Sequence, residues 1–130
     1  MNQKLVVRYQ DGRVLKGHSR DFFPNKTHFH LQPIDGTDPA TVTVSDLKGV
    51  FTVRSFEGDP KNRSRRHDVE QAGLGKRIKV TFKDGEVVIG YTSGYSADRP
   101  TFFVFPADPD SNTERILVIT AATTSVEFLE

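Results

Sequence analysis

The chain has 130 residues, of which 35% are hydrophobic, and it carries a formal net charge of +1 and no cysteine. The small net charge excludes a strong overall field for polyanions, and the lack of cysteine excludes disulfides and thiolate metal sites. No apolar run approaches the ~20 residues that span a bilayer, and no hydrophobic leader precedes the first strand-like segment, so a cytoplasmic protein with no membrane partner is expected.

An internal repeat runs through the chain, found by placing Asp84-Gly85 over Asp11-Gly12 at an offset of 73 residues. The alignment gives eight identical pairs in one ungapped block, which include Val7/Val80, Val14/Val87, Gly17/Gly90, Phe29/Phe102 and Pro33/Pro106. After Asp108 the second copy has a longer turn, and the alignment resumes with Thr41–Val44 over Ile116–Ile119 and Val50 over Ser125. Similarity at a fixed offset indicates two copies of one structural unit.

Each copy is predicted to form five short strands, because apolar and polar residues alternate between turns rich in Gly, Pro and Asx residues. The predicted strands are residues 4–10, 13–20, 27–32, 41–45 and 49–54 in the first copy, and residues 77–83, 86–92, 101–105, 115–120 and 124–129 in the second. Asp11-Gly12 and Asp84-Gly85 are expected to form tight hairpin turns, which need a positive φ. Gly17 and Gly90 lie inside the second strands, where a missing side chain permits a sharp bend. The fold class is therefore all-β, with two tandem, strongly bent, five-stranded barrels.

Residues 57–76 are predicted to be a basic Gly/Pro linker between a first domain, 1–56, and a second domain, 77–130. Within the linker, Asp68 and Gln71 match a capping box, which indicates one helical turn. Units this small bury little surface and leave strand edges open. The two copies are therefore expected to associate by edge pairing or by face packing.

Both copies resemble the SH3/Sm-like fold of Sm, LSm and Hfq proteins. The resemblance is most visible in residues 7–17, which are similar to the first Sm motif, and in residues 44–50, which are placed like the second. The two copies together are also similar to a bacterial tandem domain family of unassigned function. The resemblance implies RNA contacts at an Asp-x-x-x-Asn segment, here Asp21 to Asn25, and at a basic-Gly pair, here Lys48-Gly49. The second copy has neither pattern.

Candidate nucleic-acid-binding residues come from the aromatic loop, the basic-Gly pair and the linker. They are Phe22, Phe23, Asn25, Lys48, Arg63, Arg65, Arg66 and Lys76. The basic side chains would hold phosphates while Phe22 or Phe23 stacks on a base. The other interpretation of the two rings is that they plug the barrel core.

Catalytic motifs are missing from the sequence, which has no Gly-x-Ser-x-Gly elbow, phosphate loop or dinucleotide fingerprint. The prediction is a non-catalytic binding or scaffold module without cofactor or metal, whose partner is RNA or a protein.

His28 and His30 alternate on one strand face and could both reach a metal, but histidines at the rim of the barrel are the favoured interpretation. An adaptor that joins proteins, or its own copies, through strand edges is the alternative. A PilZ-like cyclic dinucleotide receptor is less favoured. The segment Asn62-Arg63-Ser64 begins like that family's Asp/Asn-x-Ser-x-x-Gly motif, but His67 stands at the position of the glycine.

Overall fold

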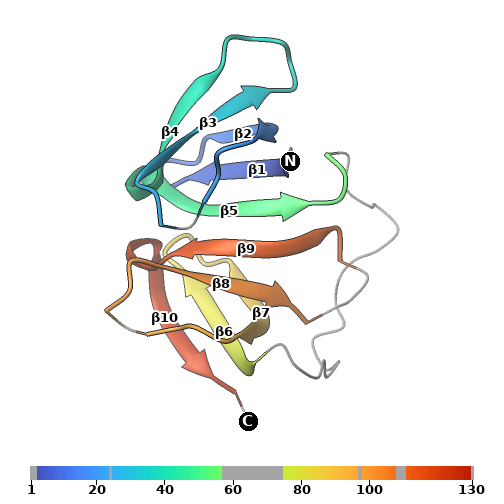
Figure 1. The fold of residues 1–130 in the computed structure, drawn as a ribbon. Coiled ribbons are helices and arrows are strands. Elements are labelled where there is room, and N and C mark those ends of the chain that lie inside the picture. Colours follow the sequence, from blue (N-terminus) through green and yellow to red (C-terminus); the bar gives the residue numbers. More distant parts are fainter. Residues whose placement is uncertain (1–2, 24, 57–74, 97, 108–110, 130) are drawn as a thin grey trace.

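A computed structural model describes residues 3–23, 25–56, 75–96, 98–107 and 111–129. These residues form ten β-strands and two short 3₁₀ turns, so the predicted all-β class is confirmed (Figure 1). Within the same ranges, no helix has the length and apolar character needed to cross a membrane. The basic residues Lys61, Arg63, Arg65 and Arg66, the PilZ-type segment 62–64 and the expected helical turn around Asp68 lie outside the described residues.

The ten strands form two sets of five. The first half contains β1 Gln3–Tyr9, β2 Val14–Ser19, β3 His28–Pro33, β4 Ala40–Thr43, η1 Val44–Asp46 and β5 Leu47–Val53. The second half contains β6 Lys76–Phe82, β7 Val87–Thr92, β8 Thr101–Pro106, β9 Thr113–Ile119, η2 Thr120–Ala122 and β10 Thr123–Phe128. Each predicted strand is present, and its ends fall within two residues of the expected bounds.

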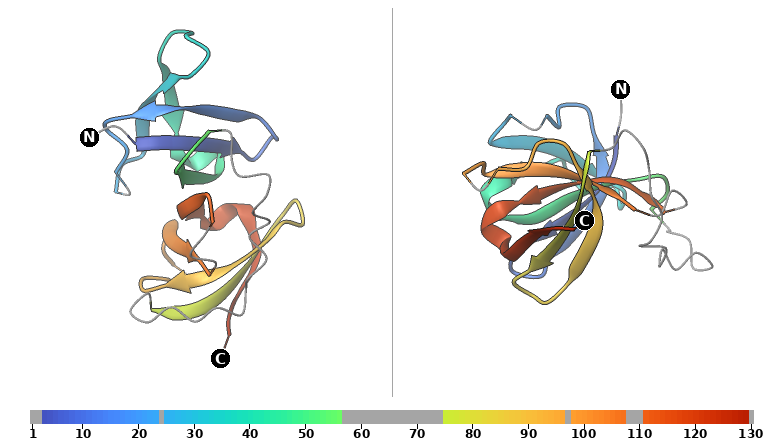
Figure 2. Two further views of the ribbon diagram at one scale, coloured as in Figure 1. Left: turned by 90° about the vertical axis from the view of Figure 1, so that its right-hand side faces the viewer. Right: turned by 90° about the horizontal axis from the view of Figure 1, so that it is seen from below.

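All ten strands belong to one antiparallel sheet with the order β10-β6-β7-β8-β9-β5-β1-β2-β3-β4. Each half has the same internal order, in which the fifth strand precedes the first four. The sheet bends strongly within each half, as the further views in Figure 2 show, but it does not close on itself. The prediction of two tandem barrels is therefore not confirmed. The halves instead meet edge to edge along β5 and β9, which confirms the expectation of edge pairing.

The repeated turns and glycines occupy equivalent positions in the two halves. Gly12 and Gly85 have φ values of +97° and +93°, as the hairpin prediction requires. Gly17 is paired with Pro33 and Gly90 with Pro106, where β2 and β7 bend against the next strand. A Cβ built on Gly17 would lie 2.3 Å from the carbonyl oxygen of Gln32, and one on Gly90 would lie 2.2 Å from that of Phe105. The glycines therefore permit a close backbone approach.

The end of the repeat alignment is wrong by one residue. Val7 is paired with Val50 in the first half, and Val80 is paired with Val126 in the second. Val50 thus corresponds to Val126 and not to Ser125. Because side chains alternate with a period of two along a strand, a one-residue slip would turn the equivalent side chains to opposite faces.

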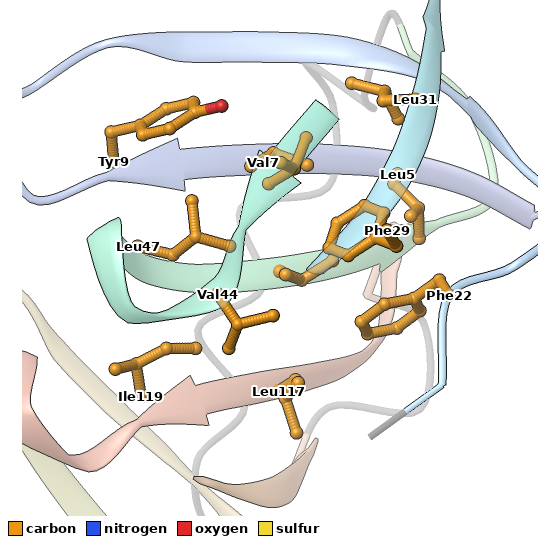
Figure 3. Close-up of a cluster of buried hydrophobic side chains, with 12 residues drawn as sticks. Leu5, Val7, Tyr9, Phe22, Phe29, Leu31, Val44, Leu47, Leu117 and Ile119 are labelled. Carbon is orange, nitrogen blue, oxygen red and sulfur yellow. The ribbon is translucent and has the colours of Figure 1, made fainter. Parts of the chain in front are cut away.

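Two hydrophobic cores lie on either side of the β5–β9 pairing, and each takes residues from both halves. Leu117 and Ile119 of β9 pack in the first core, together with residues of the first half (Figure 3). Phe51 and Val53 of β5 pack in the second core, together with Val6. Strands that are buried on both faces carry apolar residues without alternation, as in the run Ile116–Ile119. We call this region, the β5–β9 ladder with its flanking contacts, the joint.

Candidate functional site

The aromatic loop between β2 and β3 contributes one buried and one exposed ring. Phe22 is 2% exposed and packs edge-to-face on Phe29 with a centroid distance of 4.9 Å (Figure 3). The second half repeats this contact between Tyr95 and Phe102 at 4.7 Å. Phe22 is therefore a core plug and is not accessible to a base. Phe23 is 51% exposed and remains the ring that can stack on a ligand.

Lys48 lies in the joint and not on an RNA-accessible surface. Its side chain is only 8% exposed and forms ion pairs with Asp84, at 2.8 Å, and with Glu86. The ammonium also lies 4.8 Å from the centroid of the Phe82 ring. The hydrogen bond from Lys48 holds the pKa of Asp84 below its ordinary value. Lys48 thus links β5 of the first half to the Asp84-Gly85 turn of the second half through these ion pairs.

Removing the carboxylates around Lys48 is expected to weaken the joint. The double variant Asp84→Asn/Glu86→Gln leaves a buried ammonium without an opposite charge, and we expect a loss of about 2 kcal/mol in unfolding free energy. The cost is below that of a fully buried pair because both carboxylates are partly exposed. Urea denaturation measures the loss. Asp11→Asn, in the equivalent turn, is the control and should change stability little, because Asp11 pairs with the exposed Arg13.

Two further predicted site residues, Asn25 and Lys76, lie within the part of the chain that the structure describes. Asn25 is exposed, and it lines two shallow cavities that face the second half. Lys76 is exposed at the start of β6, with its ammonium 5.6 Å from the centroid of the Phe128 ring on β10. The Asp21 to Asn25 segment also departs from the RNA pattern, because the Asp21 carboxylate is occupied by hydrogen bonds within the loop.

Asp21 holds the aromatic loop against β3. One carboxylate oxygen accepts hydrogen bonds from the His30 backbone N–H at 2.9 Å and from the Ser19 hydroxyl at 3.1 Å. The other oxygen lies 2.7 Å from Nδ1 of His30. The side-chain and backbone hydrogen bonds from His30 lower the pKa of Asp21 from 3.8 to about 2. Asp21 is therefore ionised at neutral pH and orients the His30 ring.

The depressed pKa of Asp21 predicts an acid-sensitive loop. Since the folded-state value lies below the unfolded one, the stabilisation is fully present above about pH 4 and is lost as the pH falls towards 2. The side chain is about one-third exposed, so we expect a contribution of about 1 kcal/mol. Unfolding free energies measured from pH 5 to 2 should fall less steeply for Asp21→Asn than for the wild type. Equal slopes would contradict this assignment.

A basic groove of about 620 Å³ crosses the joint where β1, β5 and β9 lie side by side. It is lined by Gln3, Lys4, Arg20, Phe23, Thr52, Val53, Arg54, Glu114 and Arg115. Among the residues that the structure describes, this lining contains four cationic side chains, one carboxylate and the exposed ring of Phe23. This arrangement gives a local positive field that the net charge of the chain does not reveal.

Several of these cations are held by neutral groups. Arg115 donates from Nη2 to the amide oxygen of Gln3 at 3.2 Å, and its guanidinium lies 4.7 Å from the centroid of the Phe103 ring. Lys4 donates to the backbone carbonyl of Arg54 at 3.3 Å. The pair between Arg54 and Glu114 is long, at 4.0 Å. Neutral acceptors thus orient Lys4 and Arg115, and a neutral acceptor leaves the charge of a side chain uncompensated.

Sequence reasoning found Phe23 but missed the cations of the groove. Lys4 and Arg115 stand at opposite ends of the chain and meet only because β5 and β9 pair. The groove also has no copy in the second half, where Ser93 and Ser96 occupy the repeat positions of Arg20 and Phe23. No local motif marks such a site.

A second cavity, the histidine pocket, adjoins the groove at Arg20, which lines both. Its volume is about 560 Å³, and it is lined by His18, Ser19, Arg20, Asp21, His30, Leu31, Gln32 and Pro39. His28 lies elsewhere on β3 and contacts the Thr27 hydroxyl through Nδ1 at 2.9 Å. Among the residues that the structure describes, no group of three His, Asp or Glu side chains is placed to hold a metal ion.

A family model described as "Family of unknown function (DUF6982)" matches residues 1–130 of the chain. No curated protein and no solved structure matches the chain.

Proposed function

We propose that this chain, which belongs to the DUF6982 family, is a non-catalytic module of two Sm-like units that binds single-stranded RNA in the basic groove. The Sm-like assignment is supported by the strand order common to both halves and by the glycine bend of each second strand. The binding proposal is carried by one observation: among the described residues, four cations, one carboxylate and the exposed ring of Phe23 line the same groove at the joint.

The groove combines the two interactions that a single strand offers regardless of its sequence. Phosphates bind cations with release of counterions, which lowers log K by about 0.7 per phosphate for each tenfold rise in salt. A base stacked on an aromatic ring adds about 1–3 kcal/mol, and Phe23 lines the same groove as the cations that would hold the neighbouring phosphates. The linker residues Arg63, Arg65 and Arg66 remain part of the proposal as further backbone contacts.

Fluorescence anisotropy with a labelled eight-nucleotide RNA, measured between 50 and 300 mM salt, tests the proposal. Arg54→Ala/Arg115→Ala should weaken binding by at least ~10-fold and flatten the salt dependence, because two phosphate contacts are lost. Phe23→Ala should weaken binding by a similar factor with the salt dependence unchanged. The matched control Arg13→Ala/Lys83→Ala removes the same charge outside the groove and should bind like the wild type.

Two outcomes would overturn the proposal. One is an equal loss in the groove variant and its control, which would show that only net charge matters. The other is a loss confined to Arg63→Ala/Arg65→Ala/Arg66→Ala, which would place binding on the linker alone.

A second candidate function is an adaptor that accepts a partner's strand at an edge of the sheet. Within the described residues, β10 pairs only with β6 and β4 only with β3, so both ends of the sheet offer backbone groups to another chain. A second copy is a poor occupant, because Thr124 and Glu127 stand at the repeat positions of Lys48 and Phe51 in the joint. We therefore expect a monomer in size-exclusion chromatography with light scattering, and a dimer or larger ring would favour self-pairing instead.

A further inference from the structure

We propose that the RNA strand continues from the basic groove into a second, mostly apolar cavity at the joint, where Lys26 holds a phosphate and Asn25 contacts the base that follows. This inference deepens the proposed function and rests on it. The cavity has a volume of about 390 Å³ and is the larger of the two that Asn25 lines. We call it the apolar cavity.

The apolar cavity exists because the two 3₁₀ turns meet at one end of the joint. β5 begins after η1, β9 ends before η2, and the two strands pair antiparallel, so both turns lie at the same end of the ladder (Figure 1). Equivalent hydrogen bonds fix the turns, from the Val44 N–H to the Thr27 carbonyl and from the Thr120 N–H to the Pro100 carbonyl, each at 2.9 Å. The cavity thus has a wall from each half, and its volume falls within the range of about 300–1,000 Å³ that small-ligand sites occupy.

The loop between β2 and β3 connects the apolar cavity with the groove. Phe23 lines the groove, whereas Asn25 and Lys26 line the apolar cavity. The backbone N–H of Lys26 donates to the carbonyl of Phe23 at 3.2 Å, and the Lys26 ammonium lies 5.3 Å from the centroid of the Phe23 ring. A phosphate attached to a nucleotide stacked on Phe23 would therefore lie near this ammonium.

The charges along this path favour an anionic strand. Lys26 is the one charged residue among the described residues that line the apolar cavity. It is exposed, and it forms no ion pair within the part of the chain that the structure describes. The smaller cavity beside Asn25 is lined by Arg99 and, among the described residues, by no carboxylate. Because Asp98 precedes Arg99 in the chain and offsets part of its charge, we assign the phosphate to Lys26.

The rest of the lining suits a neutral, planar group with a polar edge. Apolar side chains form much of the wall, among them Val44, Pro100, Ile119 and Ala121. The exposed amide of Asn25 supplies both a donor and an acceptor. A nucleobase has two apolar faces and a hydrogen-bonding edge, so it fits this lining better than a second phosphate does. Since a carboxamide can pair with any base edge, we expect contact without base preference.

NMR chemical-shift perturbation of the full chain by an eight-nucleotide oligo(U) tests where the strand runs. In the wild type, the RNA should shift amides of the groove, such as Thr52 and Val53, and amides of the apolar cavity, such as Thr101 and Ala121. Lys26→Ala should keep the shifts in the groove and reduce those in the cavity, because the phosphate that leads into the cavity loses its cation.

Fluorescence anisotropy with the same RNA gives the size of the effect. Lys26→Ala should weaken binding about fivefold at 0.1 M salt and lower the salt slope by about 0.7, as expected for one phosphate contact. The exposed Lys83 lines neither cavity, so Lys83→Ala is the charge-matched control. Ala121→Glu places a carboxylate at the cavity and should also weaken binding about fivefold. Ser125→Glu adds the same charge at an exposed position of β10 and should bind more tightly than Ala121→Glu.

The outcomes separate this inference from the proposed function. If Arg54→Ala/Arg115→Ala weakens binding and the groove amides shift but the cavity amides do not, the strand ends at the groove. The apolar cavity is then left to another occupant, such as an aliphatic side chain of a protein, and only this inference fails. Equal losses in Lys26→Ala and Lys83→Ala would show an effect of net charge alone and overturn the assignment. If the RNA shifts no amide in either place, the proposed function fails and this inference falls with it.

Discussion

Leu117→Ala is expected to lower the free energy of unfolding by about 3 kcal/mol, the cost of a buried leucine cavity. Leu117 is 1% exposed and belongs to β9 of the second half, yet its side chain packs in the first core (Figure 3). The substitution should therefore destabilise the strands of the first half. Urea denaturation gives the magnitude, and amide hydrogen exchange in β1 and β2 shows which half responds.

Leu31→Ala is the matched comparison, because Leu31 is fully buried in the same core but comes from the first half. Both variants should show one cooperative transition and similarly increased exchange in β1 and β2. If Leu117→Ala instead increased exchange only in the second half, the cores would not be shared across the joint. The two halves would then be independent units joined by a linker.

Local signals were enough to predict the elements of this fold. Asp11-Gly12 and Asp84-Gly85 specify hairpins because the turn needs a positive φ, and Gly17 and Gly90 mark bends because no side chain fits there. The register after β8 could not be predicted, because the longer second turn has no internal signal of its length. The pairings of Phe102 with Val118 and of Val80 with Val126 fix it.

Non-local contacts were not predictable in the same way. Lys48 looked like half of an RNA motif, but its role depends on Asp84 and Glu86, which the chain brings near only when β5 and β9 pair. The groove has the same origin, since Arg115 reaches Gln3 across the joint. Phe22 and Phe23 are adjacent in sequence, and only the packing on Phe29 decides that the first is buried.

Gly17→Ala is expected to cost about 3 kcal/mol, more than a glycine at an open turn. The added Cβ would lie 2.3 Å from the carbonyl oxygen of Gln32, which is backbone and cannot turn aside. β3 would have to move, and its pairing with β2 is limited to Gly17–Pro33 and His18–Gln32. Thermal and urea denaturation measure the effect, and the loss should appear first as faster amide exchange in β3.

Gly12→Ala separates this steric effect from backbone strain, because Gly12 has a φ of +97° and no atom within 4 Å of an added Cβ. Its cost should be about 1 kcal/mol, that of placing alanine in the left-handed region. Gly90→Ala and Gly85→Ala repeat the comparison in the second half and should give the same ranking. A cost for Gly17→Ala no larger than that for Gly12→Ala would mean that β3 can yield at this crossing. The bend would then not depend on the missing side chain, and the histidine pocket, which opens where β2 and β3 part, would lose its fixed shape.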